Sequence, residues 1–193
     1  MSPRTKQQNE EIRQKRMAII KETALELFGR LGYHSTSISR IAKEAGISKG
    51  LLYNYFNGKE ELLEAILMDA MDSSEVWWNE IMNNIADPYE QLKQITEMAI
   101  QMITHDLHHW RLLTSLAFQV DVLKSLEPVL MRKQEVMIAQ TVDLFERLGV
   151  EDPKHEAFYY GALMDGIFLH YMNLGEQYPL QEMMNFILTR YKK

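Results

Sequence analysis

The stretch Thr36–Lys59, TSISRIAKEAGISKGLLYNYFNGK, predicts two short helices joined by a tight turn. Ser37 and Ser48 can each cap a helix, because a serine hydroxyl accepts a hydrogen bond from a free backbone N–H at a helix start. Gly46 lies between them and can adopt the left-handed conformation that ends a helix. Apolar residues recur at helical spacing on one side of the two helices: Ile38, Ile41, Ala42, Ala45, Leu52 and Phe56.

The second of these helices turns other side chains outward. Leu52 and Phe56 lie four apart on one face, which can pack inward and so turn the following residues largely outward: Lys49, Gly50, Tyr53 and Asn54. An exposed helix end that carries lysine, tyrosine and asparagine suits the major groove of DNA. The stretch therefore predicts a helix-turn-helix that reads DNA.

The same region carries a dense set of motif positions: Phe28, Gly32, Tyr33, Thr36, Ser37, Ile38, Ile41, Ala42, Ala45, Gly46, Ile47, Ser48, Gly50, Leu52, Tyr53, Tyr55, Phe56, Lys59, Glu60 and Leu62. This set closely resembles the N-terminal signature of the TetR family of bacterial transcriptional regulators. Two positions depart from the signature. Leu51 stands where the family more often has a small or hydroxyl side chain, and Gly58 stands where serine or asparagine often caps the next helix.

The resemblance implies which side chains meet DNA. Those expected at the bases are Lys49, Gly50, Leu51 and Tyr53. Those expected at the phosphates are Ser37, Ser39, Ser48, Asn54, Tyr55 and Lys59. Leu51 has no polar group, so it can select a base only by apolar contact, such as with a thymine methyl.

The charge of the chain is divided unevenly. The whole sequence has 21 lysines and arginines against 27 aspartates and glutamates, a net charge of −6. Residues 1–60 hold 11 basic and 6 acidic side chains, a net +5, which leaves 10 basic and 21 acidic, a net −11, for residues 61–193. A basic head can bind phosphate while an acidic body repels the duplex and orients the approach. Alternatively, the acidic helices are merely solvated.

Composition bounds the class of protein. The 193 residues are 46% hydrophobic, enough for one or two compact domains with a core. Cysteine is absent, which excludes disulfides, thiolate nucleophiles and cysteine metal sites. The polar start and the lack of a long apolar run predict a cytoplasmic protein without membrane segments.

No alternating strand pattern is present, so we expect an all-α fold of about nine helices. Residues 1–60 would form the DNA-binding domain and residues 61–193 a ligand-sensing and dimerisation domain. Hydrophobic periodicity, capping residues and helix-breaking residues predict five further helices with both limits: Glu10–Leu31, Lys59–Asn84, Leu107–Val120, Pro128–Leu148 and Lys154–Asn173. The second of these is expected to bend at Asp72–Ser74. Two more helices are expected to start at Pro88 and at Pro179.

The helix Lys154–Asn173 is apolar around almost its whole circumference, which predicts burial on two sides. A second copy of the chain would supply the second side, and an ordinary central core helix is the alternative. The predicted dimer interface comprises Gly161, Asp165, Gly166, Met184, Ile187 and Leu188. A two-fold dimer requires a near-palindromic double-stranded operator, with half-site centres about 34–36 Å apart or a multiple of that spacing.

The 13 methionines suit a pocket that can repack around an apolar ligand. Together with the resemblance they predict a site for an apolar or amphipathic effector of unknown identity, neutral or cationic in preference. Its predicted lining is Trp78, Met82, Met98, Met102, Trp110, Leu113, Phe118, Met137 and Phe168. A close-packed, methionine-rich core is the alternative at each position.

Signals for catalysis are few. His105, His108 and His109 with Asp106 could ligate zinc if one helix continued through them, or could form a polar interhelical turn. Asp165 could contact a ligand or act as a base, or simply cap and pack. We therefore expect a homodimeric repressor, not an enzyme, with no metal or cofactor. The alternatives are a DNA-binding dimer without an effector, and a helical metal-binding protein or enzyme.

Overall fold

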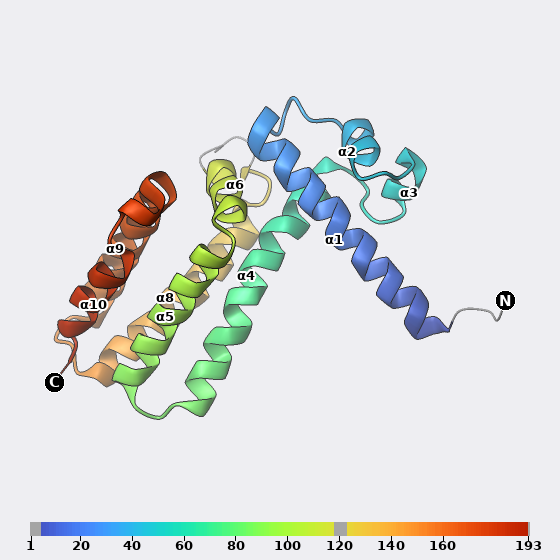
Figure 1. The fold of residues 1–193 in the computed structure, drawn as a ribbon. Coiled ribbons are helices and arrows are strands. Elements are labelled where there is room, and N and C mark those ends of the chain that lie inside the picture. Colours follow the sequence, from blue (N-terminus) through green and yellow to red (C-terminus); the bar gives the residue numbers. More distant parts are fainter. Residues whose placement is uncertain (1–4, 118–122, 193) are drawn as a thin grey trace. The chain divides into compact units, whose positions relative to one another are not determined.

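The computed structural model describes residues 5–117 and 123–192, and every regular element within them is helical. The elements are α1 (Lys6–Leu31), α2 (Ile38–Glu44), α3 (Lys49–Tyr53), α4 (Lys59–Asn84), α5 (Pro88–His105), α6 (Leu107–Ala117), α8 (Glu127–Leu148), α9 (Pro153–Leu174), the 3-10 turn η1 (Gly175–Gln177) and α10 (Leu180–Thr189) (Figure 1). The nine α-helices among the described residues confirm the predicted all-α fold. None of them is long and apolar enough to cross a membrane.

The chain divides into two compact units. The first comprises the described residues of Met1–Ala70 and Arg111–Lys124, and the second those of Met71–Trp110 and Ser125–Lys193. Helices α4 and α6 therefore each contribute residues to both units. The division after residue 60 that the sequence suggests stays a prediction.

The first unit is built around the packing of α1, α2 and α3. Its fully buried side chains come from every helix that contributes to it: Ile20, Ala24, Leu25, Leu27, Phe28, Ile41, Ala42, Leu52, Phe56, Leu62, Leu63, Ile66, Leu113 and Leu116. The inner positions predicted for α2 and α3 are confirmed at Ile41, Ala42, Leu52 and Phe56.

Helix α1 starts earlier than predicted. It begins at Lys6 rather than Glu10, because Thr5 and Gln8 form a capping box in which each side chain accepts the other's backbone N–H, at 3.2 and 3.0 Å. Ile19 is 51% exposed, so this apolar side chain lies outside the core.

The second unit is a layered bundle. Helix α8 packs on α5 and α9, and α10 packs on α5 and α9 (Figure 1). Its core holds Ile81, Leu92, Ile95, Ile103, Leu144, Phe145, Leu148, Ala157, Tyr160, Met164, Ile167, Leu180, Met184, Ile187 and Leu188. One buried and one part-buried polar contact cross it: Thr96 Oγ1 lies 2.8 Å from the buried Tyr160 hydroxyl, and Arg147 donates to Gln91 Oε1 at 2.7 Å nearer the surface.

The later helices follow their predicted limits within one or two residues, apart from the predicted end at Val120, which lies outside the described residues. Helix α4 continues without interruption through Asp72–Ser74, so the serines do not break it. Gly149, at φ 75°, ends α8 in the left-handed conformation. Helix α10 ends at Thr189, yet Tyr191 beyond it packs 5.2 Å from the Phe145 ring and donates to Glu156 at 2.5 Å.

Candidate nucleic-acid interface

The turn between α2 and α3 has the geometry that its sequence predicts. Ser37 accepts the backbone N–H of Arg40 at 3.2 Å, and Ser48 accepts that of Leu51 at 3.1 Å, so each serine caps its helix. Gly46 adopts φ 68°, which lets the next N–H, of Ile47, bond back to the Ala42 carbonyl at 2.9 Å. The two helices are therefore locked by local hydrogen bonds.

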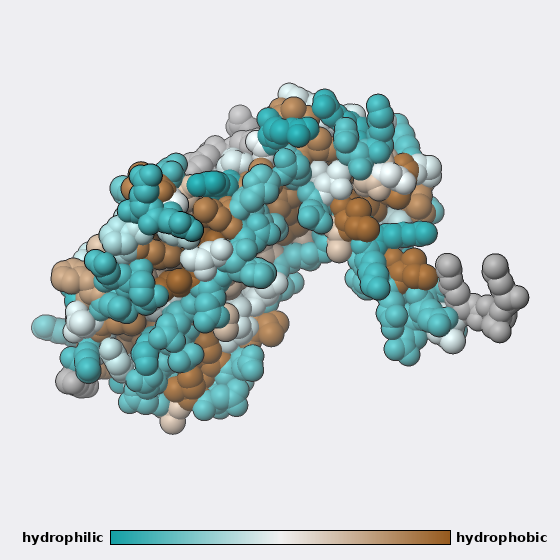
Figure 2. Space-filling view, viewed as in Figure 1, coloured by the Kyte–Doolittle hydropathy of each residue, from teal (hydrophilic) through white to brown (hydrophobic). Residues whose placement is uncertain are grey.

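The residues predicted to face bases lie at the surface of α3. Lys49, Gly50 and Tyr53 are exposed, Tyr53 by 46%, and Leu51 is half-buried. The Lys49 ammonium lies 5.9 Å from the centre of the Tyr53 ring. A Cβ at Gly50 would have no atom within 4 Å, so the glycine leaves open space on the outer side. Figure 2 shows this part of the surface as largely hydrophilic with isolated apolar patches.

The predicted phosphate contacts fall into three groups. Ser37 and Ser48 use their oxygens as helix caps, which leaves each hydroxyl proton available to donate. Ser39 and Asn54 are exposed. Tyr55 is half-buried, and the Arg13 guanidinium lies 5.3 Å from the centre of its ring. That pairing of α1 with the end of the helix-turn-helix was not predicted, since no sequence spacing indicates it.

Lys59 differs from the other predicted phosphate ligands because its ammonium points into the first unit. Nζ donates to the carbonyl oxygens of Tyr33 at 2.7 Å, Thr36 at 3.0 Å and His34 at 3.5 Å. It also lies 4.2 Å from the centre of the Tyr33 ring. Burial lowers the pKa of Lys59, because leaving water disfavours its charged form.

The start of α4 is tied to the residue that precedes Gly58. Gly58 offers no capping side chain, and Glu61 Oε2 accepts the backbone N–H of Asn57 at 2.6 Å. Glu60 and Glu61 also place negative charge in the first turn, where the helix dipole favours it. The first turn of α4 is therefore stabilised by its two glutamates and not by a side chain at position 58.

The residues predicted to line an effector site are distributed differently. Trp78, Met82, Trp110 and Phe168 are half-buried against the core of the second unit, and Leu113 is buried. Met137 is 54% exposed on α8, so it lines no enclosed cavity in this structure, and Phe118 lies outside the described residues.

An open depression of about 510 Å³ lies along the second half of α5. It is lined by Met98, Gln101, Met102, Thr104 and His105, of which the two methionines were predicted. The side chain of Trp77, on α4, buries its indole N–H without a hydrogen-bond acceptor among the described residues. A buried donor of this kind can be satisfied by an acceptor atom of a ligand or by water.

The histidine cluster serves the joint between α5 and α6. Asp106 Oδ1 accepts the backbone N–H of His109 at 2.9 Å, in the pattern of a helix cap. In residues 5–117 and 123–192, no three histidine, aspartate or glutamate side chains are placed to hold a metal ion.

Comparison with known proteins bears on the same segment. The profile of bacterial regulatory proteins of the tetR family matches residues 20–66, which include α2, α3 and their turn. Over 186 residues the chain is 28% identical to the HTH-type transcriptional regulator BetI of Escherichia coli O157:H7, with 88% of each chain covered. Residues 20–66 therefore match the DNA-binding domain of the tetR family.

Other relatives align over shorter stretches. It is 31% identical over 104 residues to the fatty acid metabolism regulator protein of Bacillus subtilis (strain 168), covering 54% of this chain and 53% of that protein. The matched region covers between 17% and 53% of the length of the first three curated relatives. The chain therefore spans about half or less of each of these proteins.

A solved structure of AibR in complex with isovaleryl coenzyme A and operator DNA shares the fold. Its TM-score is 0.71 at 21% sequence identity, and the match covers 91% of this chain and 97% of that one.

The residues predicted for a dimer interface separate into two groups. Met184, Ile187 and Leu188 are 0%, 3% and 6% exposed because α10 turns them into the core of its own chain, so their side chains do not face outward as expected. Gly161 and Gly166 are half-exposed with open space beside them, and Asp165 is exposed.

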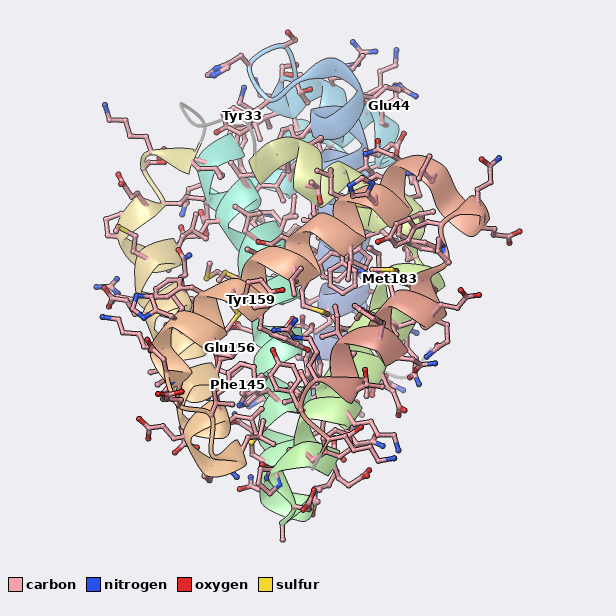
Figure 3. All side chains as sticks on the ribbon, turned by 90° about the vertical axis from the view of Figure 1, so that its left-hand side faces the viewer. Tyr33, Glu44, Phe145, Glu156, Tyr159 and Met183 are labelled. Atoms are coloured by element: carbon pink, nitrogen blue, oxygen red, sulfur yellow. The ribbon has the colours of Figure 1, made fainter. Side chains whose placement is uncertain are left out.

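The outer side of α9 and α10, which faces the viewer in Figure 3, carries large apolar side chains. Phe158, Tyr159, Leu169 and Phe186 are 51%, 43%, 42% and 66% exposed. The sequence of α9 predicted two apolar sides. The single chain buries one side, through Ala157, Tyr160, Met164 and Ile167, and leaves the other open.

Proposed function

We propose that this protein is a sequence-specific transcriptional repressor that binds double-stranded operator DNA through α2 and α3. The observation that carries the proposal is the locked helix-turn-helix, which presents Lys49, Leu51 and Tyr53 on the outer side of α3. The net charge of +5 over residues 1–60 supports it, because phosphate attraction supplies much of DNA affinity. A DNA-binding regulator acts in the cytoplasm of a bacterium.

The test is selection of bound genomic DNA followed by gel retardation on the selected site. We expect retardation that depends on sequence, and a near-palindromic site. Leu51→Ala should change the preferred base at one position of each half-site, because an apolar contact to a base is lost. Retardation that is equal on unrelated DNA of the same length would refute the proposal.

We further propose that the protein acts as a homodimer through the exposed apolar side of α9 and α10. Phe158 and Phe186 are aromatic and highly exposed, and large apolar side chains of this kind mark protein interfaces. The half-exposed Gly161 and Gly166 would permit close approach of a second helix. Helix α10 contributes through Phe186 rather than through the buried Met184, Ile187 and Leu188.

Sedimentation velocity tests the interface with a matched pair of variants. Phe186→Glu should yield monomers, whereas Val76→Glu, at a side chain that is 68% exposed on α4, should leave the dimer intact. Gly161→Leu should also yield monomers, because its new side chain would occupy the space for a partner helix. A dimer that persists in Phe186→Glu and Gly161→Leu would place the interface elsewhere.

The effector we propose is an apolar or amphipathic small molecule that carries an acyl chain. The Bacillus relative is named a regulator of fatty acid metabolism, and the AibR structure holds isovaleryl coenzyme A. Met98 and Met102 line an open depression in the second unit, where flexible thioethers suit an apolar chain.

Acyl-coenzyme A thioesters and free fatty acids of graded length are the first probes, screened by thermal shift. If a hit is the effector, the ligand lowers the affinity of the protein for operator DNA, and operator DNA must lower the affinity of the protein for the ligand by the same factor. The coupling free energy is expected to be about 1–3 kcal/mol. Equal ligand affinities with and without operator would favour the alternative of a DNA-binding dimer that needs no effector.

A further inference from the structure

We propose that the carboxyl group of Asp165 takes up a proton when a second copy of this chain covers the outer side of α9, which makes self-association depend on pH. This role of Asp165 rests on the homodimer proposed above and concerns the same surface. Helix α9 contains two acidic residues, and the other one, Glu156, accepts a hydrogen bond from Tyr191.

Asp165 interrupts an apolar stripe on the exposed side of α9. Phe158 lies seven residues before it, Ala162 three residues before it and Leu169 four residues after it, so the four side chains share one side of the helix. All four residues are exposed. The residues that α9 buries in its own chain, such as Met164, lie on the other side. Asp165 is therefore a single charge within the surface that a second copy would cover.

The carboxylate of Asp165 has no partner within the part of the chain that the structure describes. It forms no hydrogen bond or ion pair there, whereas Asp143 and Asp152 of the same unit lie 2.9 Å and 2.7 Å from a basic side chain. Partial burial raises the pKa of Asp165 above its ordinary value, because leaving water disfavours the charged form. The charge of Asp165 is thus disfavoured before any second copy approaches.

The elements packed against α9 do not neutralise this charge. Helix α8 packs on α9 and is joined to it by a short loop, so Asp165 lies about level with the middle of α8, while η1 and α10 fold back along α9. The charged groups that these elements bring toward its level are Arg132, Lys133 and Glu135 on α8 and Glu182 on α10, with Glu176 on η1 and Arg190 on α10 further along. Lys133 is held by Asp72 and Glu75, and none of these groups forms an ion pair with Asp165.

A second copy that covers the stripe removes more water from this carboxyl. The pKa of Asp165 should therefore be higher in the dimer than in the separate chains. The dimer then holds protons that the separate chains release, so dimerisation is strongest below the pKa of the separate chains and weakens as pH rises through the pKa of the dimer. Each proton taken up changes the dissociation constant by about tenfold per pH unit in that window, and two-fold symmetry supplies two such carboxyls.

The experiment is sedimentation equilibrium of the full-length protein from about pH 5 to about pH 8, where circular dichroism shows each variant folded. Asp165→Asn keeps the shape of a protonated carboxyl but carries no charge. We expect the wild-type dissociation constant to rise by about tenfold or more over this range. Asp165→Asn should dimerise more tightly than the wild type at the upper end and depend little on pH. Glu80→Gln, at an exposed carboxylate on α4, should behave as the wild type.

The outcomes separate the role of Asp165 from the proposed homodimer. A wild-type dimer whose dissociation constant does not change with pH contradicts the role of Asp165 alone. So does a pH dependence that persists in Asp165→Asn, because another group, such as the exposed His155 or His170 of α9, would then carry it. Weaker dimerisation of Asp165→Asn would mean that the carboxylate stays charged and pairs with a cation of the second copy. A wild type that is monomeric at every pH contradicts the homodimer as well.

Discussion

Gly29 allows a close approach between α1 and α6, and its replacement gives a sharp test of the structure. A Cβ at position 29 would lie 2.2 Å from Cδ2 of Leu112, on α6, and 3.2 and 3.3 Å from its Cγ and Cβ. In an open helix, Gly→Ala stabilises by about 0.5–1 kcal/mol. Here the added methyl must displace Leu112, and overpacking of this kind costs about 1–3 kcal/mol. We expect Gly29→Ala to lower the free energy of unfolding by about 1–2 kcal/mol.

A double-mutant cycle isolates the contact. The free energy of unfolding is measured by urea titration, followed by circular dichroism, for the wild type, Gly29→Ala, Leu112→Ala and the double variant. Because Leu112→Ala removes the atoms that the new methyl would strike, the double variant should be more stable than the sum of the single effects by at least about 1 kcal/mol. A stabilising Gly29→Ala, with additive effects in the cycle, would show that α1 and α6 are not in this contact.

Other predictions follow from backbone geometry and buried hydroxyls. Gly46→Ala should destabilise by about 1–2 kcal/mol in thermal unfolding, because φ 68° is costly for a residue with a Cβ. Thr96→Val should cost about 1–3 kcal/mol by leaving the Tyr160 hydroxyl without its partner, and Tyr160→Phe should cost less, because Thr96 keeps its 2.7 Å bond to the Leu92 carbonyl. Burial raises the pKa of Tyr160 to about 12, so the folded state holds a proton that the unfolded state loses from about pH 10. Stability should therefore fall between pH 10 and 12 in urea titrations, and less steeply in Tyr160→Phe.

The reading element could be predicted from the sequence because its signals are local. Ser37, Gly46 and Ser48 each act within four residues along the chain, through capping bonds and a left-handed turn. The apolar spacing of Ile41, Leu52 and Phe56 then identifies the inner side, and the structure buries all three. Local hydrogen bonds and helical periodicity are the parts of folding that a sequence displays most directly.

What could not be predicted depends on contacts between distant residues. Met184, Ile187 and Leu188 lie at helical spacing and share one buried stripe, but periodicity does not say whether a stripe meets its own chain or a second copy. Lys59 was assigned to phosphate by resemblance to the family. Its carbonyl partners lie 23 to 26 residues earlier in the chain, beyond any local pattern.

Two hydrogen-bonded side chains at the start of α4, those of Lys59 and Glu61, connect this helix to the helix-turn-helix. Glu61 binds the Asn57 N–H, and Lys59 binds the turn that precedes α2, so the first turn of α4 is fixed to both ends of the helix-turn-helix. Helix α4 then continues unbroken for 26 residues, about 39 Å, into the second unit. We propose that an effector would act on α2 and α3 through these contacts at the start of α4. Lys59→Met should then weaken the coupling between effector and operator, measured as the ratio of operator affinities with and without effector.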